Sequence, residues 1–414
     1  MMALRRPERI STLCWIALLA TSLQWFNHET TVLGGTNELV KFAVWALAVA
    51  GALLARTRSS RFDLGAPFLA LLAYVSTSVI GALLGSAEIA SLARAVHLVI
   101  TIFAIRWIIS RIGLLRMVQV FILFGIGISG SALVAFLLGL TTRESGRLAG
   151  GIPPHLHPNE LALVTAFSFV CCLALWAEHR LTTTFALAAS GLFLVVLLMT
   201  GSRTSIAAFL LALAALLGRS TRVRGAVVVW FAIVTVLTVA LVQPATASRV
   251  WSNVATRNGT VTLGENIQSR ALAWNSVIHV QTRTGSILFG QGLAIKKVPV
   301  QNRFVSVQTV DSSWYSAYLQ TGLIGTLMLA LAAVSALVLS VRSRNPLLIG
   351  LMIALLISSW FESTLNDVTP SLMIFSAVAL SWAPRARATV SSLITERAST
   401  PDSRKPNRAD YHVG

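Results

Sequence analysis

The sequence predicts an all-α integral membrane protein with about twelve transmembrane helices and one large extracytoplasmic loop between the ninth and the tenth helix. Composition carries this prediction: 55% of the 414 residues are hydrophobic and only 12% are charged, whereas about a quarter of the residues of a soluble domain are charged. Apolar runs close to the ~20 residues needed to cross the hydrocarbon core also recur along most of the chain.

The expected spans follow one another from the N-terminus. They lie at about 10–26, 39–55, 64–84, 95–110 and 117–140, then in segments that end at residues 176, 200 and 219, then at 226–242, 316–340, 347–361 and 370–383. We therefore divide the chain into N-terminal helices (1–140), a core (141–384) that contains the large outer loop (244–311), and a tail (385–414). The tail is rich in Arg, Ser and Pro, which predicts a disordered cytoplasmic segment.

The charge distribution orients these spans. A formal net charge of +18 would indicate nucleic acid binding in a soluble protein, but in a membrane protein the positive-inside rule accounts for it. With a cytoplasmic N-terminus, the short inner loops collect most of the arginines. Long loops are translocated regardless of their charge, so the basic loop 244–311 is expected outside and both termini in the cytoplasm. We expect no nucleic acid partner.

Three arginines on the outer side are candidate ligands for an anion. Arg203 stands between two apolar segments with almost no loop to solvate it, and an arginine within the membrane costs a few kcal/mol. It is either a clamp for phosphate oxygens, which the planar guanidinium group suits, or a side chain that reaches the lipid headgroups. Arg147 lies in a glycine-rich loop whose backbone can approach a ligand closely, or it is an ordinary loop residue.

Arg270 belongs to a segment, 267–274, whose apolar residues have helical spacing. This pattern predicts an amphipathic helix over the membrane surface, with Arg270 directed at the site or at lipid phosphate.

Two residues are candidate general bases. Asp311 precedes a predicted membrane helix and is either its cap or the acceptor of a proton from a hydroxyl nucleophile. His157, in a proline-rich loop, is the second candidate, with a structural role as the alternative. Asn159 is expected to cap the following helix or to bind a sugar hydroxyl.

The acidic residues of the outer side are scattered, and no pair or His/carboxylate cluster has the spacing of metal ligands. We expect neither a metal nor another cofactor, because no nucleotide-binding or hydrolase motif is present either. If the substrate has a leaving diphosphate, arginines must neutralise the charge that develops on it.

Four segments of the chain resemble the O-antigen ligase / O-antigen polymerase family in order and spacing. They are the outer-loop segment 146–162, the helix break 200–205, the run from Ser269 and Arg270 through Trp274 to the glycines of 289–292, and the helix entry from Asp311 to Gly325. The first 140 residues correspond only as generic spans. The resemblance is therefore carried by the region from about 146 to 330.

The resemblance implies a GT-C-like membrane glycosyltransferase of the bacterial inner membrane. Such enzymes transfer a glycan from a polyprenyl-diphosphate carrier to a glycan or lipid-glycan acceptor, without metal or nucleotide sugar, in surface polysaccharide synthesis. Carried over to this chain, Arg203 and Arg270 would bind the diphosphate, Arg147 would assist, and Tyr315 would contact substrate. Ligases of the family usually have His where this chain has Asp311, so ligase and polymerase remain alternatives, as do Asp311 and His157 for the base.

Other functional classes remain open from the sequence. A transporter or flippase of lipid-linked oligosaccharide also suits about twelve spans, but it would place charged residues along a path within the helices. Here the spans are nearly free of charge, and the charged residues collect in the loops. A membrane anchor that uses the large loop as a docking surface is a third reading. The sugars, the linkage and the oligomeric state are not encoded in any recognisable pattern.

Overall fold

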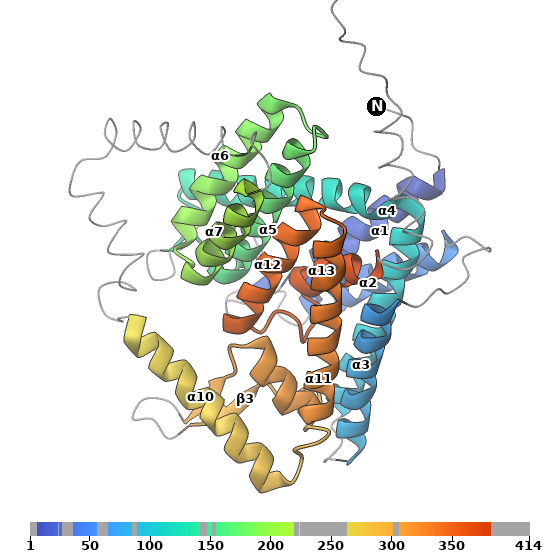
Figure 1. The fold of residues 1–414 in the computed structure, drawn as a ribbon, viewed down its shortest axis with the longest axis vertical. Helices are drawn as coiled ribbons and strands as arrows, with labels where there is room; N and C mark the ends of the chain where they lie inside the picture. Colours follow the sequence, from blue (N-terminus) through green and yellow to red (C-terminus); the bar gives the residue numbers. More distant parts are fainter. Residues whose placement is uncertain are drawn as a thin grey trace, which may run out of the picture.

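A computed structural model describes residues 6–23, 25–26, 36–55, 65–84, 89–140, 147–150, 155–218, 223, 263–300 and 306–381. The predicted ninth span, the first part of the outer loop (244–262) and the tail lie outside the described residues. Helices dominate the described part of the chain, in agreement with the predicted all-α class (Figure 1).

The helices are α1 (Arg6–Ser22), α2 (Thr36–Leu54), α3 (Ala66–Leu84), α4 (Ile89–Leu137), α5 (Pro158–Ala177), α6 (Thr183–Thr200), α7 (Arg203–Leu217), α10 (Leu263–Thr284), α11 (Ser313–Arg342), α12 (Pro346–Phe361) and α13 (Pro370–Leu380). Four short strands accompany them: β1 (Trp25–Phe26), β2 (His155–Leu156), β3 (Lys297–Pro299) and β4 (Val307–Thr309). β1 pairs antiparallel with β2, and β3 pairs antiparallel with β4.

The helix α5 is the centre of the bundle. It packs against α4, α6, α7 and α12, and almost all of its side chains are buried, including Phe167, Cys171 and Cys172. The cysteines are therefore packing residues, which is the usual role of a buried free cysteine. On the other side of the molecule α11 lies along α3 (Figure 1).

Five helices are long and apolar enough to cross a membrane by length and composition, namely α3, α4, α5, α6 and α11. Shorter apolar helices are Leu39–Leu54, α7, α12 and α13. These findings agree with an all-α membrane protein, whereas the total of about twelve spans stays a prediction. The predicted spans 95–110 and 117–140 fall on the two arms of α4, which is interrupted at Gly113 by a non-helical backbone (φ 72°, ψ 162°).

The helices of the core begin at residues that suit a helix start. Proline is the first residue of α5, α12 and α13, where the missing N–H costs no hydrogen bond. The side chains of Asn345 and Thr369 accept hydrogen bonds from the first turns of α12 and α13. α6 ends at Gly201, whose left-handed backbone (φ 59°) is the usual way to stop a helix.

The helix α11 is broken at Gly322 (φ 67°), so the predicted tenth span 316–340 is not one continuous helix. A segment that we call the crossing segment, residues 287–292, runs across the break. Four backbone hydrogen bonds join it to the helix ends: Gln291 N to Leu319 O (3.0 Å), Gly292 N to Gln320 O (2.8 Å), Leu323 N to Ile287 O (2.8 Å) and Ile324 N to Leu288 O (3.2 Å). The break therefore leaves these peptide groups paired, as buried backbone requires.

Glycine is required at both sides of this contact. A Cβ atom at Gly322 would lie 2.3 Å from the carbonyl carbon of Leu288, and one at Gly290 would lie 2.4 Å from that of Gln320. Both glycines also have positive φ angles, 67° and 71°, which other residues adopt only at a cost. The glycines of the two sequence motifs thus serve one close backbone crossing.

The described part of the outer loop forms a small structured unit. We call α10, β3, β4 and residues 313–321 the α10 unit, which lies at one end of the bundle (Figure 1). It has its own apolar core, made of Ala273, Val277, Val298, Val300, Val310 and Leu319. The helix predicted around 267–274 is part of α10.

Candidate functional site

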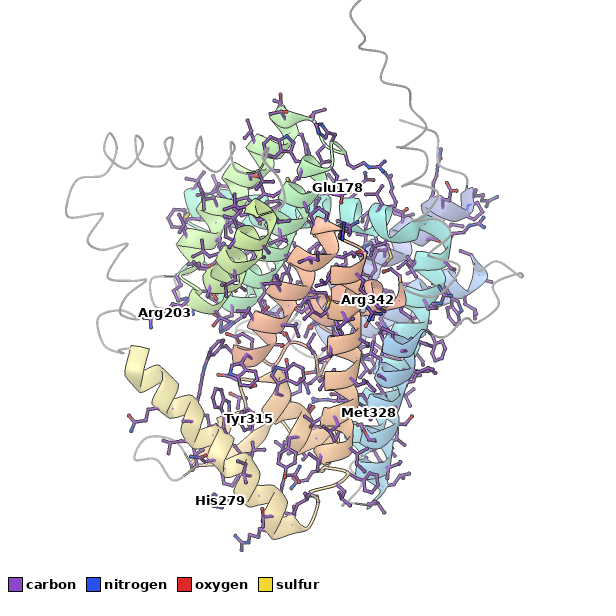
Figure 2. All side chains as sticks on the ribbon, in the orientation of Figure 1. Glu178, Arg203, His279, Tyr315, Met328 and Arg342 are labelled. Carbon is purple, nitrogen blue, oxygen red and sulfur yellow. The ribbon has the colours of Figure 1, made fainter. Side chains whose placement is uncertain are left out.

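The candidate site lies where four bundle helices meet the α10 unit. Of these four helices, α5 and α7 begin at this end, and α6 and α12 end there. The start of α11, residues 313–321, belongs to the α10 unit. In Figure 2, Arg203 marks this end of α7, Tyr315 lies between α10 and the bundle, and Glu178 marks the opposite end of α5.

Arg147 ties the loop before α5 to the end of α6. Its Nε donates a hydrogen bond to the carbonyl oxygen of Thr200 (2.7 Å), and its Nη2 donates one to Oδ1 of Asn159 (2.6 Å). Thr200 is the last residue of α6, and carbonyl groups at a helix end lack a partner within the helix. One guanidinium group therefore closes α6 and orients the first turn of α5.

Glu362 extends this network to α10. Nδ2 of Asn159 donates a hydrogen bond to Oε1 of Glu362 (3.1 Å), and Nη2 of Arg270 lies 3.6 Å from the same oxygen. The side chains of Arg270 and Glu362 are only 16% and 15% exposed, so water screens this ion pair less than a surface pair. The result is a chain of contacts from Arg147 through Asn159 and Glu362 to Arg270.

Burial raises the pKa of Glu362 to about 7. Desolvation is the main cause, because removal of a carboxylate from water disfavours its charged form. The positive charge of Arg270 opposes this shift, the negative charge of Asp311 adds to it, and Arg147 and the hydrogen bond from Asn159 lower the pKa again. Glu362 can therefore gain or lose a proton near neutral pH.

Asp311 lies directly before the N-cap of α11. The N-cap position is occupied by Ser312, without a side-chain cap bond, so Asp311 does not hold the capping position that the sequence allowed. The next residue, Ser313, fixes this helix start to the end of α12. Its Oγ donates to the carbonyl oxygen of Glu362 (2.9 Å) and accepts from the backbone N–H groups of Thr364 (2.9 Å) and Leu365 (3.1 Å).

His157 is the N-cap of α5. Its Nδ1 accepts a hydrogen bond from the backbone N–H of Asn159 (3.2 Å), which is a structural use of one ring nitrogen. The cap that the sequence allowed at Asn159 is thus at His157, while the Asn159 side chain bridges Arg147 and Glu362.

Arg203 is the first residue of α7, immediately after the left-handed Gly201 and the N-cap Ser202. A Cβ atom built on Gly201 would lie 3.9 Å from Cγ and Nε of Arg147, so the turn before Arg203 runs alongside Arg147. The positive end of the α7 dipole faces the same region. The structure thus brings Arg203 and Arg270 to the same end of the bundle.

Aromatic rings complete the site next to Arg270. The guanidinium carbon of Arg270 lies 5.8 Å from the ring centroid of Phe361, within the range of a cation–π contact. Trp274, one turn further along α10, stacks on Tyr315 with ring centroids 4.9 Å apart and an interplanar angle of 4°. The Nε atom of Arg270 is buried and has no hydrogen-bond partner among the described residues.

Sequence reasoning placed Arg147, Asn159, Arg203, Arg270, Asp311, His157 and Tyr315 on one side of the membrane, and the structure has them at one end of the bundle. Glu362 was not among the candidates, because it was counted as one of several scattered acids. The signal was its position: an acid directly after an uncharged span (346–361). Within the described residues, no group of three or more His, Cys, Asp or Glu side chains could hold a metal ion.

Residues 186–330 match a protein-family model described as O-antigen ligase. The match covers residues 186–330 of the 414-residue chain, so the similarity to O-antigen ligases is shown for this segment. The resemblance to the O-antigen ligase/polymerase family is thereby confirmed, and with the apolar helices it supports a multi-pass protein of the bacterial inner membrane. No curated protein matches the chain.

The O-antigen ligase domain supports glycan transfer of the ligase/polymerase type in surface polysaccharide synthesis. It contains α6 from residue 186 onwards, α7, α10 and most of α11, and with them Arg203, Arg270, Asp311 and Tyr315. Arg147, Asn159 and Glu362 lie outside the matched segment. Arg147 contacts it at Thr200 and Glu362 contacts it at Arg270, while Asn159 joins Arg147 to Glu362.

Proposed function

We propose that this O-antigen ligase-type protein transfers a glycan from a polyprenyl-diphosphate carrier to a hydroxyl group of a glycan or lipid-glycan acceptor. The main support for this proposal is the chain of contacts from Arg147 through Asn159 and Glu362 to Arg270. It joins four separate segments at one end of the bundle. Half-buried arginines around a titratable carboxyl group would supply both requirements of the reaction, namely charge for the leaving group and an acceptor for the proton.

Arg203 and Arg270 are the proposed diphosphate clamp, with Arg147 as the residue that supports it. When the glycosidic bond to the carrier breaks, negative charge develops on the diphosphate, and prepositioned cations at that point stabilise the transition state. The guanidinium fork suits phosphate oxygens better than a lysine does. Nε of Arg270 is a donor that is not used within the described residues. The clamp makes a metal ion unnecessary for this proposed reaction.

The proposed reaction is a single displacement. The acceptor oxygen forms a bond to the anomeric carbon, the bond between that carbon and the carrier diphosphate breaks, and its electron pair leaves with the diphosphate. The hydroxyl proton passes to a carboxylate of the pair Asp311 and Glu362. The raised pKa of Glu362 supports this pair in preference to His157, since a base works best with a pKa near the operating pH.

We further propose that the site faces the periplasm and that both termini are cytoplasmic, with residues 141–384 as the catalytic core. The site contains Arg147, Arg203 and Arg270. The remaining loops contain more arginines, and the positive-inside rule assigns those loops to the cytoplasm, which leaves the site on the outer side.

The test is a transfer assay with the full-length protein in proteoliposomes, with a polyprenyl-diphosphate-linked glycan as donor. Arg203→Ala and Arg270→Ala should each lower the rate by about 100-fold or more, the usual effect of removing a group that stabilises transition-state charge. Arg283→Ala is the matched control, because Arg283 lies on the same helix and is exposed. Wild-type rates in both clamp variants would refute the proposed function.

A further inference from the structure

We propose that Trp274 and Tyr315 form the subsite for the sugar that is bonded directly to the carrier diphosphate. The two rings come from different segments, α10 and the start of α11, and stack almost parallel with centroids 4.9 Å apart. Both side chains are half-buried rather than enclosed in the core. This inference rests on the proposed function, because it needs the diphosphate at Arg270.

The position of Trp274 relative to Arg270 fits this role. The two residues are four positions apart on α10, so they share one face of the helix and are separated by about 6 Å along its axis. Arg270 contacts Glu362 on that face. A sugar bonded to a phosphate held by Arg270 lies close to that phosphate, and Trp274 is about one helical turn away from Arg270.

Tyr315 is held in place independently of α10. Ser313, two residues earlier, makes three hydrogen bonds to the segment 362–365. These bonds fix the first turn of α11 against the end of α12, beside Glu362. The aromatic pair therefore joins α10 to the first turn of α11, and Figure 2 shows Tyr315 between α10 and the bundle.

The chemistry of the pair favours a sugar over the prenyl chain. A sugar ring presents C–H groups on its faces and hydroxyl groups at its edge, and an aromatic side chain with a polar tip matches both. The indole N–H of Trp274 is buried and has no acceptor among the described residues, whereas a buried Trp N–H usually has one. Within the described residues, α10 is not among the helices that are long and apolar enough to cross a membrane.

The test measures the binding of two kinds of lipid to the full-length protein in detergent. One is undecaprenyl diphosphate without a sugar, and the other is undecaprenyl diphosphate that carries a single sugar, either N-acetylglucosamine or galactose. The wild-type protein should bind the sugar-bearing lipids more tightly. Trp274→Ala and Tyr315→Ala should weaken binding of the sugar-bearing lipids by about tenfold and leave the affinity for the bare diphosphate unchanged. That unchanged affinity also shows that the variants are folded.

Two further variants sharpen the test. Trp274→Phe keeps an aromatic face but loses the N–H, and it should show an intermediate loss of about threefold. Trp360→Ala is the matched control, because Trp360 lies at the end of α12 and is 50% exposed; it should change neither affinity. Trp274→Phe is also the reporter if Trp274→Ala fails to fold.

The outcomes separate the two proposals. If the wild-type protein does not prefer the sugar-bearing lipids, or if the preference survives in Trp274→Phe, Trp274→Ala and Tyr315→Ala, the sugar subsite is overturned while the diphosphate clamp stands. If Arg270→Ala leaves the affinity for both ligands unchanged, the clamp itself is contradicted, and the sugar subsite falls with it.

Discussion

The centre of the bundle and its α10 end use opposite kinds of contact. Around α5 the contacts are apolar and continuous, and nearly every side chain is buried among others of its kind. At the α10 end, Arg147, Asn159, Glu362 and Arg270 order one another through hydrogen bonds and an ion pair. This difference indicates that apolar packing sets the positions of the helices, whereas the polar network orients the side chains at their ends. Variants should therefore separate stability from activity.

The largest effect is expected from Glu362→Gln, which removes a charge at the polar end and keeps the shape of the side chain. Transfer should fall by about 100-fold or more, because general base catalysis typically contributes ~10²–10⁴. The amount of folded protein in the membrane should stay close to wild type. The measurement is initial rate per folded protein in proteoliposomes.

Glu178→Gln is the matched control for this variant, since Glu178 caps the opposite end of α5. It should retain wild-type activity. A fully active Glu362→Gln enzyme would remove Glu362 from the reaction and return the choice of base to Asp311 or His157.

The next effect concerns the backbone crossing between the two regions. Gly322→Ala introduces a Cβ atom 2.3 Å from a backbone carbon at a residue with positive φ, and such a backbone strain alone costs ~1–3 kcal/mol. We expect a lower melting temperature in detergent and less folded protein. Gly127→Ala should have little effect, because no atom beyond its chain neighbours and its own helix backbone lies within 4 Å of a Cβ built there. Equal melting temperatures for the two variants would contradict the interlocked crossing.

A smaller effect is expected on the pH dependence of the reaction. If the carboxyl pair accepts the proton, the rate should rise with pH and level off above about 7, the pKa of Glu362, with a slope of about tenfold per pH unit below it. Asp311→Asn removes the like charge that raises this pKa, so the midpoint of the remaining activity should move to lower pH. An unchanged midpoint would argue that the two carboxyl groups do not interact.

The stability that Glu362 contributes should decrease with pH over the range in which the reaction rate increases. The folded protein holds the Glu362 proton up to a pH of about 7, whereas the ordinary value is 4.5. Between these values the folded state binds more protons than the unfolded state, so the stability contributed by this group decreases as the pH rises. Thermal melts of Glu362→Gln should lack this component.

The smallest effect is expected from chelation. Because arginines supply the charge in the proposed reaction, excess EDTA should leave the rate of the wild-type protein unchanged within error. The same preparation with Arg270→Ala is the negative control for the assay. A rate that EDTA abolishes and Mg²⁺ restores would require a cation in addition to the clamp.

Much of the architecture was predictable from apolar runs, because a membrane span must satisfy its backbone within the segment. The helix around 267–274 and the shared side of Arg147, Arg203 and Arg270 also followed from local pattern and charge. The break at Gly322 did not, because it depends on a crossing segment 30 residues earlier in the chain (Gly292 to Gly322). Glu362 was missed for the same reason: its partners Asn159 and Arg270 are distant in sequence, and only packing brings them together.

The crossing at Gly322 has a consequence for how substrate range can diverge. Because carbonyl and amide groups make this joint, it places no demand on the side chains of residues 287 and 288 beyond their fit in space. Apart from Gly290 and Gly322, which the close approach requires, the α10 unit is thus attached to the bundle through backbone groups that every residue has. Exposed residues of α10 can therefore change in evolution while Arg270, on the same helix, keeps its contact with Glu362.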